Sequence, residues 1–423
     1  GPWMHYWQSR VLTNYGRLDD AVGALEQAKD GFAERSDGLG MVRALLQEGS
    51  IHRLRSEYAE AIAKTDQALS LMGDNQDASL TAMAHSIVGI CHGLQGELEL
   101  GLARLQEALT LFESLGEDHL YDVANTLHDI GAIYYSVDIE RYLHYSRKAL
   151  VVWRQLGATG PMAMTLNNIG AAEYRQGRFD AALMTLEEAL SESQAMGLIR
   201  PQAYAQATLG DVHRARGERG LARQAYQEAL DLAEEADEGY LIGYLRDAMG
   251  NLERLLGNFE TAEQLIDQAI EKAYEHGSDH EVAVSQISQG ILLFTEGKDQ
   301  EALRTLEQAV SSLRGGSARQ ELAKAHLHLA CVLFHRQAVG EALLNLEMAL
   351  DTLAQSGFDP LLVDEGTGSR PLMEHALGGT TMHGHRYLLG RLLARTEPAG
   401  DDAPRCLPSL RLSAWSSLLL APR

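Results

Sequence analysis

Apolar residues along this chain recur at intervals of three and four instead of alternating, from the first residues to about Gly357. This spacing gathers apolar side chains on one face of a helix. The clearest stretch is residues 163–196, MAMTLNNIGAAEYRQGRFDAALMTLEEALSESQA. It predicts two short antiparallel helices, with Leu166 and Leu186 among the side chains that form the core between them.

Small residues in the same stretch mark where the two helices must approach closely. Gly170 is expected to face Ala182 across the pair, Gly177 to end the first helix, and Ala189 to let the next helix dock. A larger side chain at these points would push the helices apart.

The pattern repeats along most of the chain. Its first small position is taken in turn by Ser9, Gly49, Gly89, Gly131, Gly170, Gly210, Gly250, Gly290 and Ala330. The steps between them are 40, 40, 42, 39, 40, 40, 40 and 40 residues. They predict about nine antiparallel helix pairs of tetratricopeptide type, with about six residues more per pair than the usual period. The expected fold is therefore all-α: a right-handed superhelical solenoid with C-terminal capping helices and almost no strand.

Glycines recur after the second helix of several pairs. Gly157, Gly197, Gly277 and Gly357 stand about one or more repeats apart, as expected for left-handed residues that stop helices. Asp237 takes the corresponding place in another pair, and it adopts that conformation less comfortably than glycine.

One pair, from about residue 121 to residue 156, departs from the pattern. Gly131 and Ala149 are separated by 18 residues where 19 is usual, and Tyr142 occupies the crossing point where alanine is usual. We expect the two helices to be splayed. Either the superhelix bends here or something binds here, and bending is the preferred interpretation.

The sequence divides into three expected parts. Residues 1–357 form the solenoid, residues 358–396 a capping segment, and residues 397–423 a linker or disordered tail. Within the capping segment, residues 371–377 and 384–395 read as short helices. Such helices would cover the last apolar face of the array.

Composition narrows the function classes. The formal net charge is −23, so most of the surface would repel nucleic acid, and we expect no direct nucleic-acid binding. No run approaches a membrane span, so no membrane partner is expected. Cys91, Cys331 and Cys406 lie far apart without paired spacing, which favours a reducing, cytoplasmic setting. The Gly1-Pro2 start resembles a protease-cleavage scar, and we expect an excised fragment.

No motif for catalysis is found. The chain has no GxxxxGK[ST] phosphate loop and no GxSxG nucleophile motif. His326, His328, Cys331 and His335 do not share one helix face as a clean ligand set. We therefore expect no enzyme, no metal and no cofactor.

The concave groove is the expected functional surface, because the first helices of the pairs line it. We read the positions six and three before the repeated small residue, and one and four after it. These positions hold amides, charges and aromatic rings that suit an extended peptide or a partner helix. The candidate binding residues are Asn125, His128, Tyr135, Asn167, Tyr174, Tyr204, Asp211, Arg214, Tyr244, Asp247, Asn251 and Arg254. The alternative is an ordinary solvated inner surface with half-packed tyrosines.

The repeat unit LNNIGAAEYRQGRFDAALMTLEEAL and the segments HLHLACVLF and GFDPLLVDEG resemble the arrays of bacterial MalT-like and SARP-like transcription regulators. The resemblance covers about residues 9–357. It implies a sensing arm that sits beside an NTPase and a DNA-binding domain. PSLRLSAW, residues 408–415, is similar to the opening strand of the winged DNA-binding domain of such regulators, but the sequence then departs into SSLLLAPR.

Two functions from different classes follow. The first is the non-enzymatic sensing or regulatory arm of a bacterial transcription regulator, which binds a protein, a peptide or other domains of the same regulator. The alternative is a free-standing adaptor or a Rap-like peptide receptor that assembles other proteins.

Overall fold

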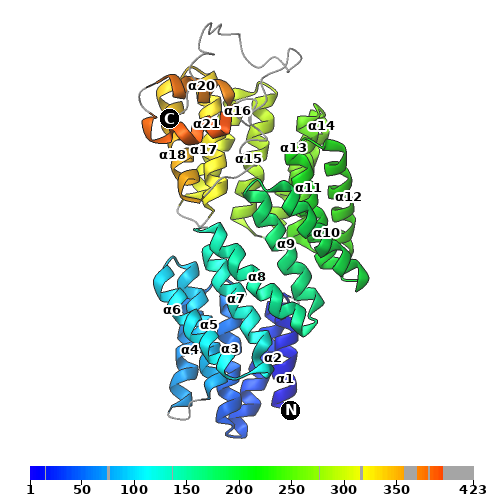
Figure 1. The fold of residues 1–423 in the computed structure, drawn as a ribbon, viewed down its shortest axis with the longest axis vertical. Coiled ribbons are helices and arrows are strands. Elements are labelled where there is room, and N and C mark those ends of the chain that lie inside the picture. Colours follow the sequence, from blue (N-terminus) through cyan, green and yellow to red (C-terminus); the bar gives the residue numbers. More distant parts are fainter. Residues whose placement is uncertain are drawn as a thin grey trace. The chain divides into compact units, whose positions relative to one another are not determined.

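The structure is a computed structural model that describes residues 1–14, 16–73, 77–135, 137–275, 277–314, 318–356, 369–379 and 382–393. These residues are predominantly helical and contain no strand (Figure 1). The chain begins with α1 (Pro2–Asn14), α2 (Leu18–Glu34), α3 (Gly38–Leu54), α4 (Tyr58–Met72), α5 (Ala78–Leu94), α6 (Leu98–Ser114), η1 (Glu117–His119), α7 (Leu120–Tyr134) and α8 (Ile139–Leu156).

The middle of the chain continues with α9 (Thr159–Arg175), α10 (Phe179–Ala195), α11 (Ile199–Ala215), α12 (Arg219–Glu235), α13 (Gly239–Leu255) and α14 (Phe259–Glu275). The last helices are α15 (Asp279–Thr295), α16 (Asp299–Leu313), α17 (Arg319–His335), α18 (Val339–Ser356), α20 (Arg370–Gly378), η2 (His383–His385) and α21 (Arg386–Leu393). Helices α1 to α18 form nine consecutive pairs, which confirms the repeat prediction. The chain divides into two compact units, Gly1–Ala172 with Met184–Pro201 and Glu173–Leu183 with Gln202–Arg423.

The small positions lie where the helices of a pair cross. A Cβ atom placed on Gly170 would come within 2.6 Å of the Cγ atom of Leu186. The nearest side chain is therefore Leu186, one turn beyond the expected Ala182. Ala182 and Ala189 are fully buried, as the pattern requires.

The pair α7–α8 is more open at its crossing. A Cβ on Gly131 would find its nearest neighbours, on Ser146 and Tyr145, at 3.6 Å. Ser146 faces Gly131 where most other pairs have a leucine or an isoleucine, so a smaller side chain leaves more room, and the buried Tyr142 ring lies 3.7 Å from the added Cβ.

The predicted helix stops have left-handed backbone. Gly177 follows α9 with φ of +72°, and Asp237 follows α12 with φ of 52°. An aspartate thus takes the conformation that glycine supplies elsewhere. Gly357 lies outside the described residues.

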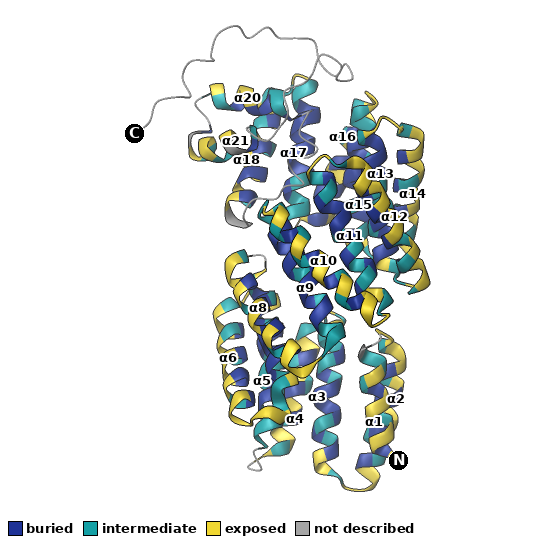
Figure 2. Cartoon of the chain, turned by 45° about the vertical axis from the view of Figure 1, so that its right-hand side comes forward, coloured by how far each residue is buried: buried dark blue, intermediate teal, exposed yellow. Residues whose placement is uncertain are grey.

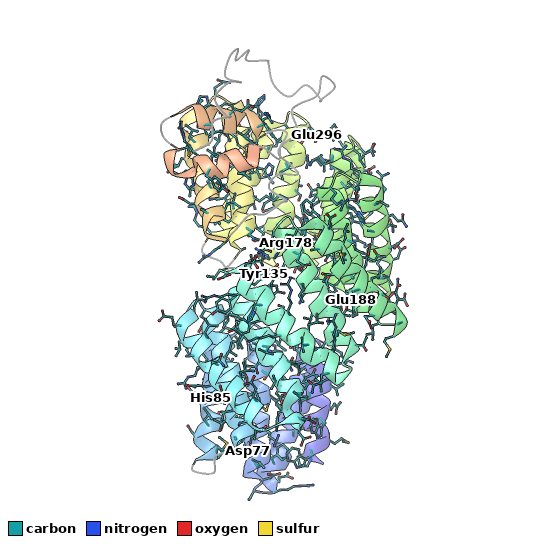
Figure 3. All side chains as sticks on the ribbon, in the orientation of Figure 1. Asp77, His85, Tyr135, Arg178, Glu188 and Glu296 are labelled. Carbon is teal, nitrogen blue, oxygen red and sulfur yellow. The ribbon has the colours of Figure 1, made fainter. Side chains whose placement is uncertain are left out.

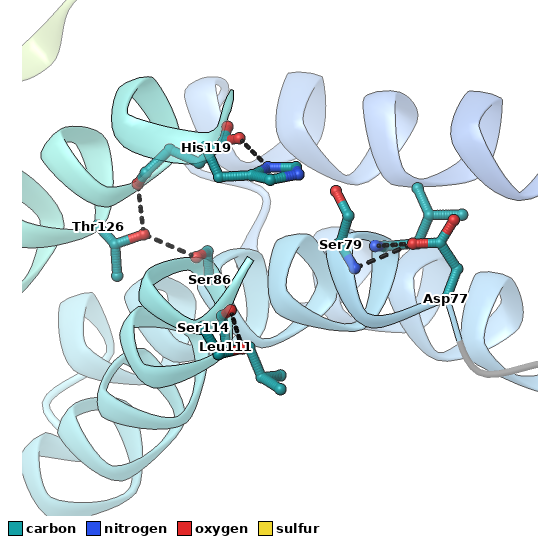
Figure 4. A network of polar contacts seen from close by, with 9 residues as sticks. Asp77, Ser79, Ser86, Leu111, Ser114, His119 and Thr126 are labelled. Atoms are coloured by element: carbon teal, nitrogen blue, oxygen red, sulfur yellow. Dashed lines mark hydrogen bonds and ion pairs between the residues drawn. The ribbon is translucent and has the colours of Figure 1, made fainter. Parts of the chain in front are cut away.

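Side-chain caps begin several first helices. The Asp77 carboxylate accepts hydrogen bonds from the backbone N–H groups of Ser79, at 2.9 Å, and Leu80, at 3.1 Å (Figure 4). These bonds satisfy donors that the start of a helix otherwise leaves unpaired. In the same view the hydroxyls of Ser86 on α5 and Thr126 on α7 lie 3.3 Å apart, which links two successive first helices.

The C-terminal helices close the apolar end of the second unit. Leu372 and Met373 of α20 and Leu389 of α21 are buried in one core with side chains of α15 to α18. Figure 2 shows the burial pattern of the array, with buried residues between paired helices and exposed residues on their outer faces. The two predicted capping helices are therefore present. The expected tail, residues 397–423, lies outside the described residues.

None of the helices in the described part of the chain combines the length and apolar character that a membrane crossing requires.

Candidate functional site

A cavity of about 200 Å³ opens among the first helices of successive pairs in the second unit. Helices α11, α13, α15 and α17 supply most of its wall, and α14 closes one side. Residues from alternate helices meet here because the first helix of each pair stacks on the first helix of the next. The lining residues are Arg214, Tyr240, Gly243, Tyr244, Asp247, Ala248, Asn251, Ala269, Ala273, His280, Glu281, Val284, Ser285, Gln320, Glu321 and Lys324.

A hydrogen-bonded group supports the cavity wall on α13. The Asn251 Nδ2 atom donates to the Ser288 hydroxyl at 2.8 Å and to the Asp247 carboxylate at 3.2 Å. The Ser288 hydroxyl in turn donates to the same Asp247 oxygen at 2.9 Å. These contacts tie α13 to α15 and fix the orientation of the Asn251 amide.

The other end of that amide is an acceptor that has no partner among the residues the structure describes. Asn251 is only 2% exposed, and its Oδ1 atom receives no hydrogen bond from the described residues. A buried acceptor left without a donor costs about 1–3 kcal/mol. Asn251 lines the cavity, and a ligand N–H group that reached this oxygen would satisfy it.

A second polar group lies beside the cavity, around Asp211 of α11. Its carboxylate accepts hydrogen bonds from the Tyr226 hydroxyl at 2.7 Å and the Tyr244 hydroxyl at 2.5 Å, and the Arg214 guanidinium lies 3.9 Å away. Burial raises the pKa of Asp211, an effect only partly offset by Arg214 and the two hydroxyls. Burial likewise raises the pKa of Tyr226 and Tyr244 well above the ordinary tyrosine range, so both hydroxyls stay donors.

The lining combines apolar and charged side chains. Tyr240, Tyr244 and Val284 give it an apolar character, while Arg214 and Lys324 face the same cavity as Glu281 and Glu321. Both signs of charge are thus present around an apolar centre. This arrangement suits a ligand with apolar groups and charges of both signs, as a peptide has.

Four of the residues predicted from the sequence line this cavity: Arg214, Tyr244, Asp247 and Asn251. Asp211 stands behind them through its bond to Tyr244. Three other predicted residues of the second unit do not line it. Tyr174 is buried, with its ring centre 6.1 Å from that of Phe179; Tyr204 reaches Glu238 at 3.5 Å; and Arg254 is buried near the end of α13.

The remaining predicted residues belong to the first unit. His128 and Tyr135 line a shallow hollow with Ala132, Tyr142 and Asn168. Tyr135, labelled in Figure 3, is 40% exposed at the end of α7, and Asn125 is exposed on the same helix. Asn167 is buried and donates to the Asn168 side chain at 3.4 Å.

The residues predicted from the sequence do not include the part of the cavity that lies nearest the N-terminal ends of the first helices. Tyr240, His280 and Gln320 each stand ten residues before the repeated small position, and Glu281 and Glu321 stand nine before it. Reading two further columns of the repeat would have found all five. The six-before column, used only for Asn125, Tyr204 and Tyr244, also contains Val284 and Lys324.

The described residues contain no group of three or more His, Cys, Asp or Glu side chains placed to hold a metal ion. Several histidines are instead engaged with single partners. His326, for example, contacts Asn345 at 2.8 Å. The chemistry visible at the cavity is that of binding by hydrogen bonds, charge and apolar contact.

Comparison with known proteins identifies the repeats. A family model described as tetratricopeptide repeat matches residues 161–235 and 240–315. A search of curated proteins finds no match.

Solved structures share the fold at low sequence identity. A Rap protein complexed with competence and sporulation factor has a TM-score of 0.61 and 15% identity, over 86% of this chain and 99% of that chain. The apo quorum sensor NprR from B. thuringiensis has a TM-score of 0.57 and 17% identity, over 81% and 99%. A STAND protein with a tetratricopeptide repeat sensor, from Pyrococcus horikoshii, has a TM-score of 0.51 and 13% identity, over 80% and 54%.

Proposed function

We propose that this chain, an array of tetratricopeptide repeats, is a non-catalytic binding arm that holds an extended peptide or a segment of a partner protein. The ligand lies along the first helices α11, α13, α15 and α17. The observation that carries the proposal is the buried Oδ1 atom of the cavity-lining Asn251, an acceptor to which none of the described residues donates a hydrogen bond.

The size of the cavity supports a peptide over a larger cofactor. Its volume of about 200 Å³ is below the roughly 300 Å³ at which pockets for drug-sized ligands begin. One apolar side chain of a peptide would fill it against Tyr244 and Val284. The peptide backbone would then give an N–H group to Asn251, and Lys324 and Glu321 would meet charges on either side.

The structural neighbours are consistent with this use of the fold. One is a Rap protein in complex with competence and sporulation factor, and another is a quorum sensor. For the role in the cell, we favour the sensing arm of a bacterial transcription regulator, working in the cytoplasm. One structural neighbour is a signal transduction ATPase that has a tetratricopeptide repeat sensor, so a repeat array of this fold can be joined to an ATPase. The alternative is a free-standing adaptor or peptide receptor.

Peptide binding can be tested with an arrayed library of short synthetic peptides. Titration calorimetry then compares the best binder with wild type, Asn251→Ala and the matched variant Asn125→Ala, which removes an exposed amide from the first unit. Loss of the buried hydrogen bond should weaken binding about tenfold in Asn251→Ala. Asn125→Ala should bind as wild type does.

Two results would count against the cavity as the site. One is a library without any binder. The other is a binder whose affinity falls in Asn125→Ala but not in Asn251→Ala, which would place binding in the first unit. The sequence of the complete gene decides the cellular role, because a contiguous NTPase or winged-helix segment would support the regulator and its absence the adaptor.

A further inference from the structure

The outer face of α8 differs in charge from every other second helix of the nine pairs. Helix α8 carries Arg141, Arg147, Lys148 and Arg154 against the single carboxylate of Glu140. In each of the other second helices, α2, α4, α6, α10, α12, α14, α16 and α18, carboxylates outnumber lysines and arginines. One outer helix of an acidic chain is therefore basic.

The exposed side chains of α8 form one stripe. Glu140, His144, Arg147, Lys148 and Val151 line a shallow hollow along the helix. Their spacing keeps them on one face over about 16 Å. Val151 is 63% exposed, so the stripe has an apolar contact point beside its charges.

Stacked tyrosines hold two of the cations in place. The rings of Tyr134 and Tyr145 stack with centroids 5.9 Å apart and planes 10° apart. The Arg141 guanidinium lies 5.2 Å from the centre of the Tyr134 ring, and the Lys148 ammonium lies 5.6 Å from that of Tyr145. The side chains are ordered before any partner arrives, which reduces the conformational entropy lost on binding.

The Lys148 charge is not matched by a carboxylate. Within the described residues Lys148 forms no ion pair, and its charge meets only the tyrosine ring. By contrast, Arg141 pairs with Asp138 at 3.3 Å, and Arg154 pairs with Glu188 of α10, which Figure 3 labels. The positive charge of Lys148 therefore stays available near the centre of the stripe, and the stripe ends beside the acidic helix α10.

We propose that the outer face of α8, centred on Arg141, His144 and Lys148, docks an Asp/Glu-rich protein segment that also carries an apolar residue for Val151. Carboxylates complement the cations, and a short segment stays within the basic stripe. No residue of this surface is among those that line the cavity between α11 and α17.

A nucleic acid suits this face less well. Single-stranded nucleic acids bind by stacking bases on open aromatic faces. Here the faces of Tyr134 and Tyr145 contact each other, Arg141 and Lys148. A longer polyanion would also meet the acidic α10 beside Arg154, and like charges repel.

Fluorescence anisotropy can test the assignment with a labelled peptide of repeated Glu-Glu-Leu units and an oligo-dT of similar length. The test variant is Arg141→Gln with Lys148→Gln, both on exposed positions. The matched control is Arg219→Gln with Arg304→Gln, which removes the same charge from the exposed surfaces of α12 and α16. Thermal melts check that both variants fold.

The wild type and the control should bind the peptide, and the α8 variant should bind it about tenfold more weakly. Added salt should weaken the wild-type complex. The proposal is overturned if the wild type does not bind the peptide, if the two double variants bind it equally, or if oligo-dT binds more tightly than the peptide. Asn251→Ala should leave peptide affinity unchanged, and an equal loss there would place the peptide in the cavity and overturn the α8 assignment.

Discussion

Asp211 is a carboxylate held in a buried place by two tyrosine hydroxyls and a nearby guanidinium. Burial raises its pKa above the ordinary carboxyl value. The folded chain therefore takes up this proton more readily than the unfolded chain does. The free energy of unfolding therefore increases as the pH falls through the raised pKa of Asp211. Above that pKa, the ionised Asp211 carboxylate destabilises the folded chain.

The direction of this pH dependence can be measured by comparing the urea unfolding of wild type and Asp211→Asn at a series of pH values. The free energy of unfolding of wild type, relative to that of the variant, should rise as the pH falls from neutrality through the raised pKa, and then level off below the ordinary carboxyl pKa. Asp231→Asn on the exposed face of α12 is the control and should not show this rise. A difference that stays flat or falls as the pH is lowered would mean that the Asp211 pKa is not raised.

The sequence predicts a polar residue of the cavity only where the repeat shows which face of the helix that residue occupies. Arg214, Tyr244, Asp247 and Asn251 were found because each occupies a column of the groove. The partners that bury them come from elsewhere. Tyr226 lies on the second helix of its pair, which the predicted groove positions do not include. Its hydroxyl donates to Asp211 only because the tyrosine side chain is long enough to cross from α12 to α11.

At the scale of helices, the crossing residue sets how closely a pair can pack. Six second helices have an aliphatic side chain at the site next to the repeated small residue: Leu25, Leu105, Leu186, Ile266, Leu306 and Leu346. In α12 the same site holds Tyr226, and a Cβ on Gly210 would lie 2.4 Å from its ring. Only a residue without a Cβ leaves room for that ring.

Two glycine-to-alanine variants separate tight from open crossings. Gly210→Ala forces the new methyl against Tyr226 and should destabilise the protein by about 1–3 kcal/mol. Gly131→Ala, where the nearest atoms are 3.6 Å away, should be neutral or stabilise by up to about 1 kcal/mol. Thermal unfolding of both variants measures the difference.

The double variant Gly210→Ala with Tyr226→Leu is the control for this explanation. It should recover part of the lost stability, because leucine vacates the space of the ring. Equal melting temperatures for Gly210→Ala and Gly131→Ala would contradict the crossing geometry.

At the scale of the whole molecule, stability is set by contacts between neighbouring repeats. Gly250→Leu gives a local perturbation, since a Cβ at that position already lies within 2.7 Å of Ile266. Hydrogen exchange followed by mass spectrometry should show faster exchange in α13, α14 and their neighbours α12 and α15. Exchange in α1 to α4 should be unchanged, and a uniform rise along the chain would instead indicate that the array opens as one unit.

The number of pairs, their boundaries and the all-helical class were predictable because one short pattern recurs with nearly constant spacing. The division into two units within the pair α9–α10 was not, since residues 163–196 follow the pattern most closely of all. The cavity also required coordinates, because it depends on how side chains from several repeats fit together. The division into solenoid, cap and tail at residues 357 and 396 remains a prediction.

The bond from Tyr226 and Tyr244 to Asp211 also bears on how such arrays can be recombined. Asp211 and Tyr226 belong to the pair α11–α12, and Tyr244 belongs to the next pair. Moving the pair α13–α14 alone would leave the buried Tyr244 hydroxyl without its acceptor, and Asp211 would lose one of its two hydroxyl donors. These two pairs would therefore have to be duplicated, deleted or transplanted together, as one module of the array.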